Sequence, residues 1–131
     1  MTRGGCLCGA VQFEVSEFSS PIFKCHCSLC RKAFGGASSS ATVVNEDAFR
    51  WVAGSETIKQ YTTPSGFMRF FCASCGSLLP QFLPDFKLQW IPVGLLDSDP
   101  GVPLKHHIHV GSKAPWEVLD EKTKRLDQGF S

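Results

Sequence analysis

The stretch Cys25-His26-Cys27-Ser28-Leu29-Cys30-Arg31 places three thiols within six residues. Four further cysteines flank this stretch, Cys6 and Cys8 before it and Cys72 and Cys75 after it. Thiolates are common ligands of Zn²⁺, which structural sites hold with four protein ligands and catalytic sites with three. The seven cysteines divide into a group of four and a group of three, so the sequence predicts two zinc ions per chain.

We expect the closed site to combine the two outer pairs, Cys6 with Cys8 and Cys72 with Cys75. Two sulfurs on one tetrahedral zinc lie about 4 Å apart, which requires a curled backbone between them. Glycines flank the first pair and Gly76 follows the second, and they permit that curl. Such a site would tie the N-terminal loop to a distant hairpin and contribute directly to folding.

The triplet Cys25, Cys27 and Cys30 is local enough to hold the second zinc by itself. Three ligands leave a position for water or for a small-molecule thiol. Two alternatives stay open. Cys72 and Cys75 could pair with two cysteines of the triplet, or a histidine such as His26 could supply a fourth ligand.

Composition indicates a soluble globular chain, with 43% hydrophobic and 19% charged residues in 131. We expect a single domain over residues 1–131. The formal net charge of only +1 argues against a nucleic-acid partner, because such binding depends on a strongly positive protein surface. Basic residues do gather late in the chain. No apolar run is long enough to span a membrane, and residues 1–5 reach Cys6 without a signal peptide's apolar segment. These features favour the cytoplasm, where thiols stay reduced.

Many short segments alternate or carry β-branched residues, which predicts a mainly β, antiparallel fold with one or two short helices. The predicted strands cover residues 10–16, 38–44, 57–62, 67–72, 78–83, 88–93 and 105–110. A short helix is expected over residues 29–34, with Ser28 as its N-cap and glycines after its end. We also expect a helical turn over residues 116–119 and a frayed tail over residues 120–131.

The late histidines are candidates for a role near the open site. On a strand, His107 and His109 would share one face and His106 would take the other. His26 and His107 are the candidates for a general base, and Arg31 could bind a ligand carboxylate. Serines 38–40 are interpreted as strand residues rather than nucleophiles.

Four segments together resemble the glutathione-dependent formaldehyde-activating enzyme family, which also includes centromere protein V. The segments, which occur in order over nearly the whole chain, are residues 5–11, 25–31, 71–76 and 109–116. The resemblance implies a β-tent-like zinc-binding fold and a carbon–sulfur lyase activity that joins glutathione and formaldehyde into S-hydroxymethylglutathione. It also implies a structural zinc on one set of cysteines and a catalytic zinc on the other. The structural set is Cys6, Cys8, Cys72 and Cys75, and the catalytic set is Cys25, Cys27 and Cys30.

The leading hypothesis is therefore an enzyme that acts on an adduct of glutathione or another small thiol. One alternative is a non-enzymatic zinc-binding interaction module with a protein or nucleic-acid partner. Another is a thiol-redox sensor, because a three-thiolate site is more easily oxidised than a closed one.

Overall fold

The strands of the computed structural model, which describes residues 1–130, form three sheets. The first sheet has the order β1-β2-β5, and its strands span Thr2–Gly5, Gln12–Val15 and Phe49–Ala53. The second sheet has the order β11-β10-β3-β4-β9-β8. Its strands span Lys124–Arg125, Leu104–Ile108, Ile22–Cys25, Ser39–Asn45, Leu88–Pro92 and Gln81–Leu83. The third sheet is the β6–β7 hairpin, Ile58–Thr62 and Met68–Cys72. The predicted mainly β fold is confirmed.

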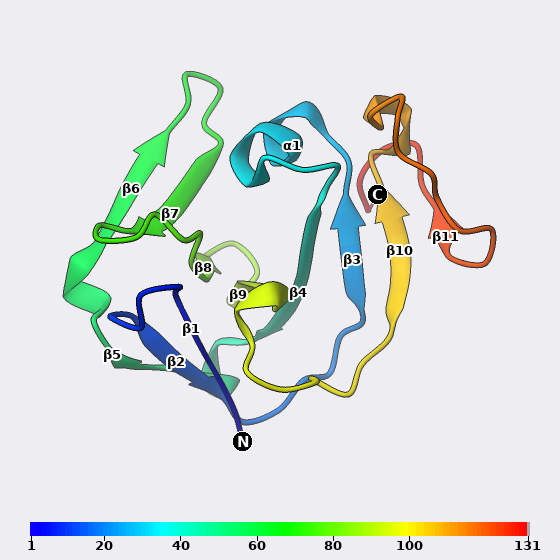
Figure 1. The fold of residues 1–131 in the computed structure, drawn as a ribbon. Coiled ribbons are helices and arrows are strands. Elements are labelled where there is room, and N and C mark those ends of the chain that lie inside the picture. Colours follow the sequence, from blue (N-terminus) through cyan, green and yellow to red (C-terminus); the bar gives the residue numbers. More distant parts are fainter. Residues whose placement is uncertain (131) are drawn as a thin grey trace.

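Helical structure in residues 1–130 consists of one α-helix and four 3₁₀ turns, and none of it is long and apolar enough to cross a membrane. The α-helix, α1, spans Ser28–Phe34. The turns η1 to η4 span Glu46–Ala48, Ser55–Thr57, Val93–Leu95 and Val110–Ser112. In Figure 1, α1 lies between the β6–β7 hairpin and the ends of β3 and β10.

The pairing around β3 brings three positions to the same end of the large sheet. Cys25 at the end of β3 lies opposite Ser39 of the antiparallel strand β4. On its other side, Cys25 lies opposite Ile108 of β10, which runs parallel to β3. The sequence predicted a mainly antiparallel fold, and the parallel pairs are those that β10 forms with β3 and with β11. The segment before β10 returns to the start of β3 (Figure 1), where Ile22 N donates to Pro103 O at 2.8 Å.

Helix α1 and its N-cap each begin one residue earlier than predicted. Cys27, with extended backbone, is the N-cap, and its sulfur accepts a hydrogen bond from Cys30 N at 3.3 Å. Ser28 is already helical, so its expected role as N-cap is wrong. Gly35 ends the helix with φ 67°, the left-handed conformation in which glycine carries little steric cost. A prospective metal ligand therefore also caps the helix.

The C-terminal tail is packed rather than frayed, and the helical turn expected over residues 116–119 does not form. Leu126 N donates to His107 O at 2.8 Å, and β11 pairs with β10. The Phe130 ring packs edge-on against Phe23 and His106, at 5.5 and 5.1 Å between ring centroids. The physical reason is the otherwise unpaired edge of β10, whose backbone groups the tail satisfies.

Candidate metal centre and adjoining cavity

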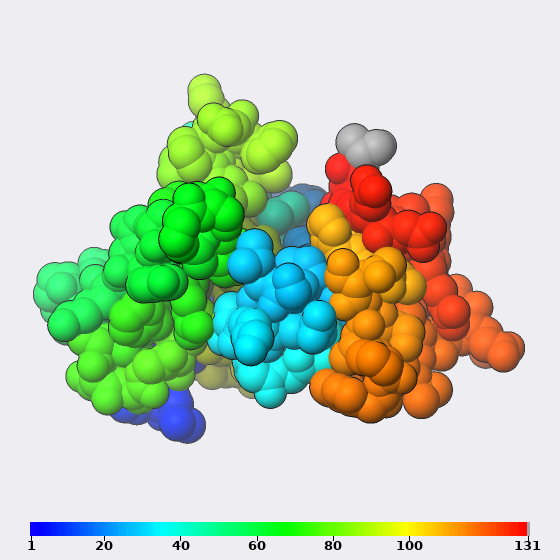
Figure 2. All heavy atoms as spheres, turned by 90° about the horizontal axis from the view of Figure 1, so that it is seen from above, coloured from blue at the N-terminus to red at the C-terminus, as the bar shows by residue number. Residues whose placement is uncertain are grey.

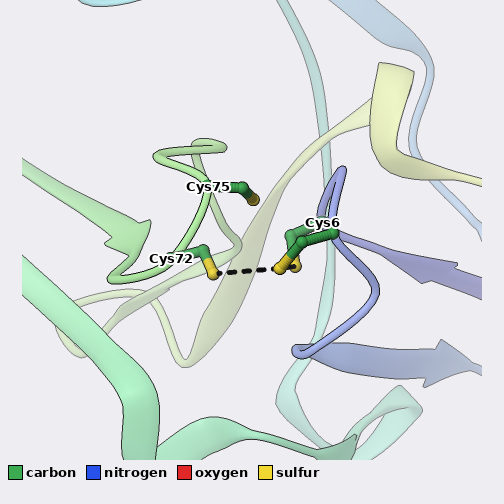
Figure 3. A group of neighbouring side chains, drawn as sticks. Cys6, Cys72 and Cys75 are labelled. Carbon is green, nitrogen blue, oxygen red and sulfur yellow. Dashed lines mark hydrogen bonds between the residues drawn. The ribbon is translucent and has the colours of Figure 1, made fainter.

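Four sulfurs from two distant segments converge on one point. They belong to Cys6, Cys8, Cys72 and Cys75, and all lie within 4.8 Å of one another. The Cys6 and Cys8 sulfurs are 3.6 Å apart, and those of Cys8 and Cys72 are 3.7 Å apart. Figure 3 shows Cys72, at the end of β7, and Cys75, in the turn that follows, facing Cys6 of the N-terminal loop. This group could hold a metal ion.

Backbone N–H groups and a local apolar cluster hold the four-sulfur group in place. Val11 N donates to Cys6 Sγ at 3.3 Å, and Ser74 N donates to Cys72 Sγ at 3.4 Å. Cys6 and Cys72 are buried in one cluster with Val11 and Leu79. The Ser77 hydroxyl, 3.3 Å from the Cys75 sulfur, lowers the pKa of that thiol to about 5. The backbone N–H donors and the Ser77 hydroxyl favour thiolates, the form that binds metal, whereas burial in the apolar cluster opposes the charge.

The second group of sulfurs is Cys25, Cys27 and Cys30, which also lie within 4.8 Å of one another. Cys25 ends β3, Cys27 caps α1, and Cys30 follows in the first turn of the helix. Cys25 and Cys30 are buried, whereas Cys27 is half-buried. A hydrogen bond between the Cys25 and Cys30 thiols lowers the pKa of Cys30 to about 6 and raises the pKa of Cys25. This group could hold a second metal ion.

The structure thus groups the cysteines as four and three, in the arrangement expected from sequence, and not in the alternative that joins Cys72 and Cys75 to the triplet. His26 does not belong to either group. Its ring is fully buried and directed to a different partner.

That partner is His107, in a chain of side chains that reaches the surface at Asp120. His26 Nε2 lies 2.9 Å from His107 Nδ1, and His107 Nε2 lies 3.1 Å from Asp120 Oδ1. Because the carboxylate accepts, His107 carries its proton on Nε2, and its Nδ1 accepts from His26 Nε2–H. Burial and the neighbouring His107 lower the pKa of His26. The side chain between two of the cysteines is therefore held as a neutral ring in one orientation.

Replacing His107 with phenylalanine should destabilise the protein. The change leaves His26 Nε2–H buried without an acceptor, and such an unsatisfied group costs about 1–3 kcal/mol. His106→Phe on the same strand is the control, because His106 is only half-buried and packs against the Phe130 ring. Urea unfolding of the two variants measures the difference. Equal losses of unfolding free energy would show that the hydrogen bond from His26 contributes nothing.

The expectation that His107 and His109 share a strand face is wrong. Strand β10 ends at Ile108, and His109 takes a left-handed conformation with φ 55° at the start of η4. The strand alternation therefore stops before His109. His107 contacts His26, and His109 lies near enough to Cys30 to influence the charge of that thiol.

A cavity of about 360 Å³ adjoins the three-sulfur group. Cys25 and Cys30 form part of its wall, whereas none of the other five cysteines lines it. Its remaining walls come from α1, from the β6–β7 hairpin and from strands β8 and β9. Figure 2 shows the surface hollowed between the hairpin (green), α1 (light blue) and the β8–β9 segment (lime). The three-sulfur group is therefore accessible to a small molecule.

Two polar residues of this cavity were not singled out as functional from the sequence. Ser39 is fully buried, and its Oγ lies within hydrogen-bonding reach of the Cys30 sulfur. Arg69 also lines the cavity, and its Nε is buried without a partner. Arg31, the arginine that the sequence favoured for a ligand carboxylate, does not line the cavity. Ser39 and Arg69 occur in ordinary strand patterns, and only the pairing of Ser39 with Cys25 reveals its position.

Comparisons with known proteins agree with this arrangement. The model of a family described as "Glutathione-dependent formaldehyde-activating enzyme" matches residues 1–112. A protein of Halomonas elongata that carries the same family name is 31% identical over 141 aligned positions, which cover 99% of this chain and 88% of the relative. A crystal structure of a Rhodobacter sphaeroides protein is similar with a TM-score of 0.61 and 25% identity, covering 79% of this chain and 99% of that one.

Proposed function

Because the chain belongs to the glutathione-dependent formaldehyde-activating enzyme family, we propose that it joins glutathione to an aldehyde. With formaldehyde the product is S-hydroxymethylglutathione, and the reverse reaction cleaves a carbon–sulfur bond, as a carbon–sulfur lyase does. The carbonyl π bond breaks while the thiol sulfur bonds to the carbonyl carbon, and the thiol proton ends on the oxygen. No oxidant or reductant is needed.

The observation that carries this proposal is the difference between the two cysteine groups. Cys25 and Cys30 line a cavity of about 360 Å³, so a substrate sulfur could reach them. The four-sulfur group has no opening onto this cavity and joins the N-terminal loop to the turn after β7. A group of three ligands beside a cavity is the arrangement of a catalytic metal, and a group of four is the arrangement of a structural one.

The donor sets fit zinc, two ions per chain. A tetrahedral zinc with Zn–S bonds of about 2.3 Å places its sulfurs about 3.8 Å apart. The separations of 3.6 and 3.7 Å within the four-sulfur group match that value and are far longer than a disulfide bond. We assign Cys6, Cys8, Cys72 and Cys75 to the structural ion and Cys25, Cys27 and Cys30 to the catalytic ion. Bound at the triplet, zinc supplies a Lewis acid that favours thiolate over thiol and polarises a carbonyl.

The chain's own residues would orient the reacting groups. Ser39 Oγ is buried within hydrogen-bonding reach of the Cys30 sulfur, and it could donate instead to the aldehyde oxygen as negative charge develops there. The pairing of β3 with β4 places Ser39 opposite Cys25, so this donor lies beside the triplet. The mostly apolar lining of the cavity lowers the local polarity around Ser39 and thereby strengthens such a hydrogen bond.

The test is product formation with zinc-loaded protein, glutathione and ¹³C-formaldehyde, followed by NMR against the uncatalysed rate. A rate above background that Ser39→Ala lowers, by about 10²-fold for the loss of one such donor, would support the proposal. Thr42→Val on the same strand is the control, because its hydroxyl donates to Ser20 O and does not line the cavity. No acceleration for any aldehyde would reject the enzyme hypothesis and favour an interaction module or a redox sensor.

We further propose that residues 1–131 act as one domain. The two cysteine groups combine segments between residues 6 and 75, and strands β10 and β11 complete the sheet beside the triplet. Seven cysteines without a disulfide suit a reducing compartment such as the cytoplasm.

A further inference from the structure

The cavity beside the three-sulfur group has mostly apolar walls. Its lining includes side chains such as Phe34, Phe67, Leu83 and Trp90, which come from four different elements or turns. Arg69 is the one positively charged residue among the described residues that line the cavity. Its guanidinium carbon lies 5.9 Å from the centre of the Phe71 ring, which does not line the cavity. A cavity of this size and composition is typical of sites for mostly apolar small molecules.

Neither glutathione nor formaldehyde matches these walls. Formaldehyde contributes a single carbon, which leaves most of about 360 Å³ unfilled. Glutathione carries two carboxylates, an ammonium group and two amides, and burying them against apolar walls without partners would be costly. Water in such a space also finds few hydrogen-bond partners, so its displacement by an apolar group is favourable.

We propose that the cavity binds the apolar group of a larger aldehyde, so that the adduct handled by this chain is a glutathione hemithioacetal with an apolar aliphatic or aromatic substituent. The inference rests on the proposed function. The adduct sulfur lies at Cys25 and Cys30, the substituent fills the cavity, and the peptide part of glutathione stays on the solvent side. Arg69, at the cavity wall with an unpaired Nε, is positioned to bind a carboxylate there.

The chemistry is the same addition as with formaldehyde. The thiol sulfur bonds to the carbonyl carbon, the carbon–oxygen π bond breaks, and the thiol proton ends on the oxygen. Only the second substituent on that carbon differs: hydrogen in formaldehyde and an apolar chain or ring in the substrates proposed here. The specificity therefore depends on the cavity and not on the three cysteines.

Binding of S-alkylglutathiones to the zinc-loaded protein tests the cavity without turnover. Calorimetric titration with the S-methyl, S-butyl and S-hexyl compounds should show affinity rising about fourfold per methylene, since each buried methylene contributes about 0.8 kcal/mol. Equal affinity across the series, or no binding by any member, would overturn the proposal.

Variants locate the bound alkyl group. Ala33→Leu fills space at the cavity wall and should weaken S-hexylglutathione binding by at least about fifteenfold, the equivalent of two methylenes. Lys32→Leu adds the same side chain on the exposed neighbouring position and should leave binding within about twofold. Leu83→Ser places a polar group in the cavity wall and should also weaken S-hexylglutathione binding. Phe82→Ser, at a position outside the wall, is its control. Chain-length dependence that persists in both cavity variants would place the alkyl group elsewhere and overturn the inference.

Turnover separates this inference from the function on which it rests. Product from formaldehyde and glutathione, combined with a flat S-alkyl series, would keep the proposed function and reject the apolar substrate. A rising S-alkyl series without turnover of formaldehyde, butanal or hexanal would keep the cavity as a binding site and reject the proposed reaction. A rising series, with kcat/KM increasing from formaldehyde to hexanal, supports both.

Discussion

The variant Cys72→Ser is expected to bind one zinc ion instead of two and to lose most of its stability. Cys72 is almost fully buried, and its sulfur lies 3.7 Å from that of Cys8, 64 positions earlier in the chain. Losing a structural metal is among the few changes that cost more than about 4 kcal/mol. Domains of this size are stable by only about 5–15 kcal/mol, so the loss is a large fraction of the total. Chelation of the wild-type protein should have a similar effect.

Two measurements check this expectation: metal content by native mass spectrometry, and thermal unfolding. Ser74→Ala is the matched control, because Ser74 is exposed in the same turn and its side chain is not one of the four sulfurs. The control should keep both ions and the wild-type melting temperature. A Cys72→Ser protein with two ions and an unchanged melting temperature would mean that the four-sulfur group is not a structural metal site.

The variant Cys27→Ser should have the opposite profile, with activity lost and the fold kept. Cys27 belongs to the three-sulfur group, so its replacement should reduce bound zinc from two ions to one. A Lewis acid supplies several kcal/mol of transition-state stabilisation, so turnover should fall by about 10³-fold or more. Serine is a preferred N-cap residue, so its oxygen can still accept from Cys30 N and keep α1 intact. The melting temperature should change by only a few degrees, as expected for a loss of about 1 kcal/mol.

Ser28→Ala is the control for this variant, because Ser28 is exposed in the first turn of α1 and contributes no sulfur. It should keep two zinc ions and full turnover. A Cys27→Ser protein with both ions and full activity would show that the triplet neither holds a metal nor takes part in catalysis. A Cys27→Ser protein that unfolded as completely as Cys72→Ser would show instead that the triplet is structural.

The secondary structure was largely predictable where local chemistry decides it. Glycine at the end of α1 and the alternation in β2 and β6 mark those elements in the sequence, and the structure contains them. The errors lie where tertiary contacts dominate. Cys27 caps α1 in place of Ser28 because the segment leaves β3 in an extended conformation up to Cys27. The tail is ordered because it completes the edge of β10, and a polar sequence gives no sign of that pairing.

The grouping of the seven cysteines was also predictable, because spacing fixes which thiols can meet. Two cysteines separated by one or two residues reach the same ion whenever the backbone curls, and the triplet needs no distant partner. The pairing of Cys6 and Cys8 with Cys72 and Cys75 followed from the count of ligands, and the structure brings those four sulfurs together.

The sequence by itself therefore determined the family, the mainly β fold and the two sets of candidate metal ligands. Only the tertiary structure decided which groups surround the triplet. Ser39 lies beside Cys25 because of the β3–β4 register, and His107 reaches His26 across 81 positions because β10 runs parallel to β3. The apolar cavity likewise exists only where α1, the β6–β7 hairpin and the large sheet meet. The physical reason is that a ligand motif is specified by spacing of a few residues, whereas a substrate cavity depends on how distant strands pack.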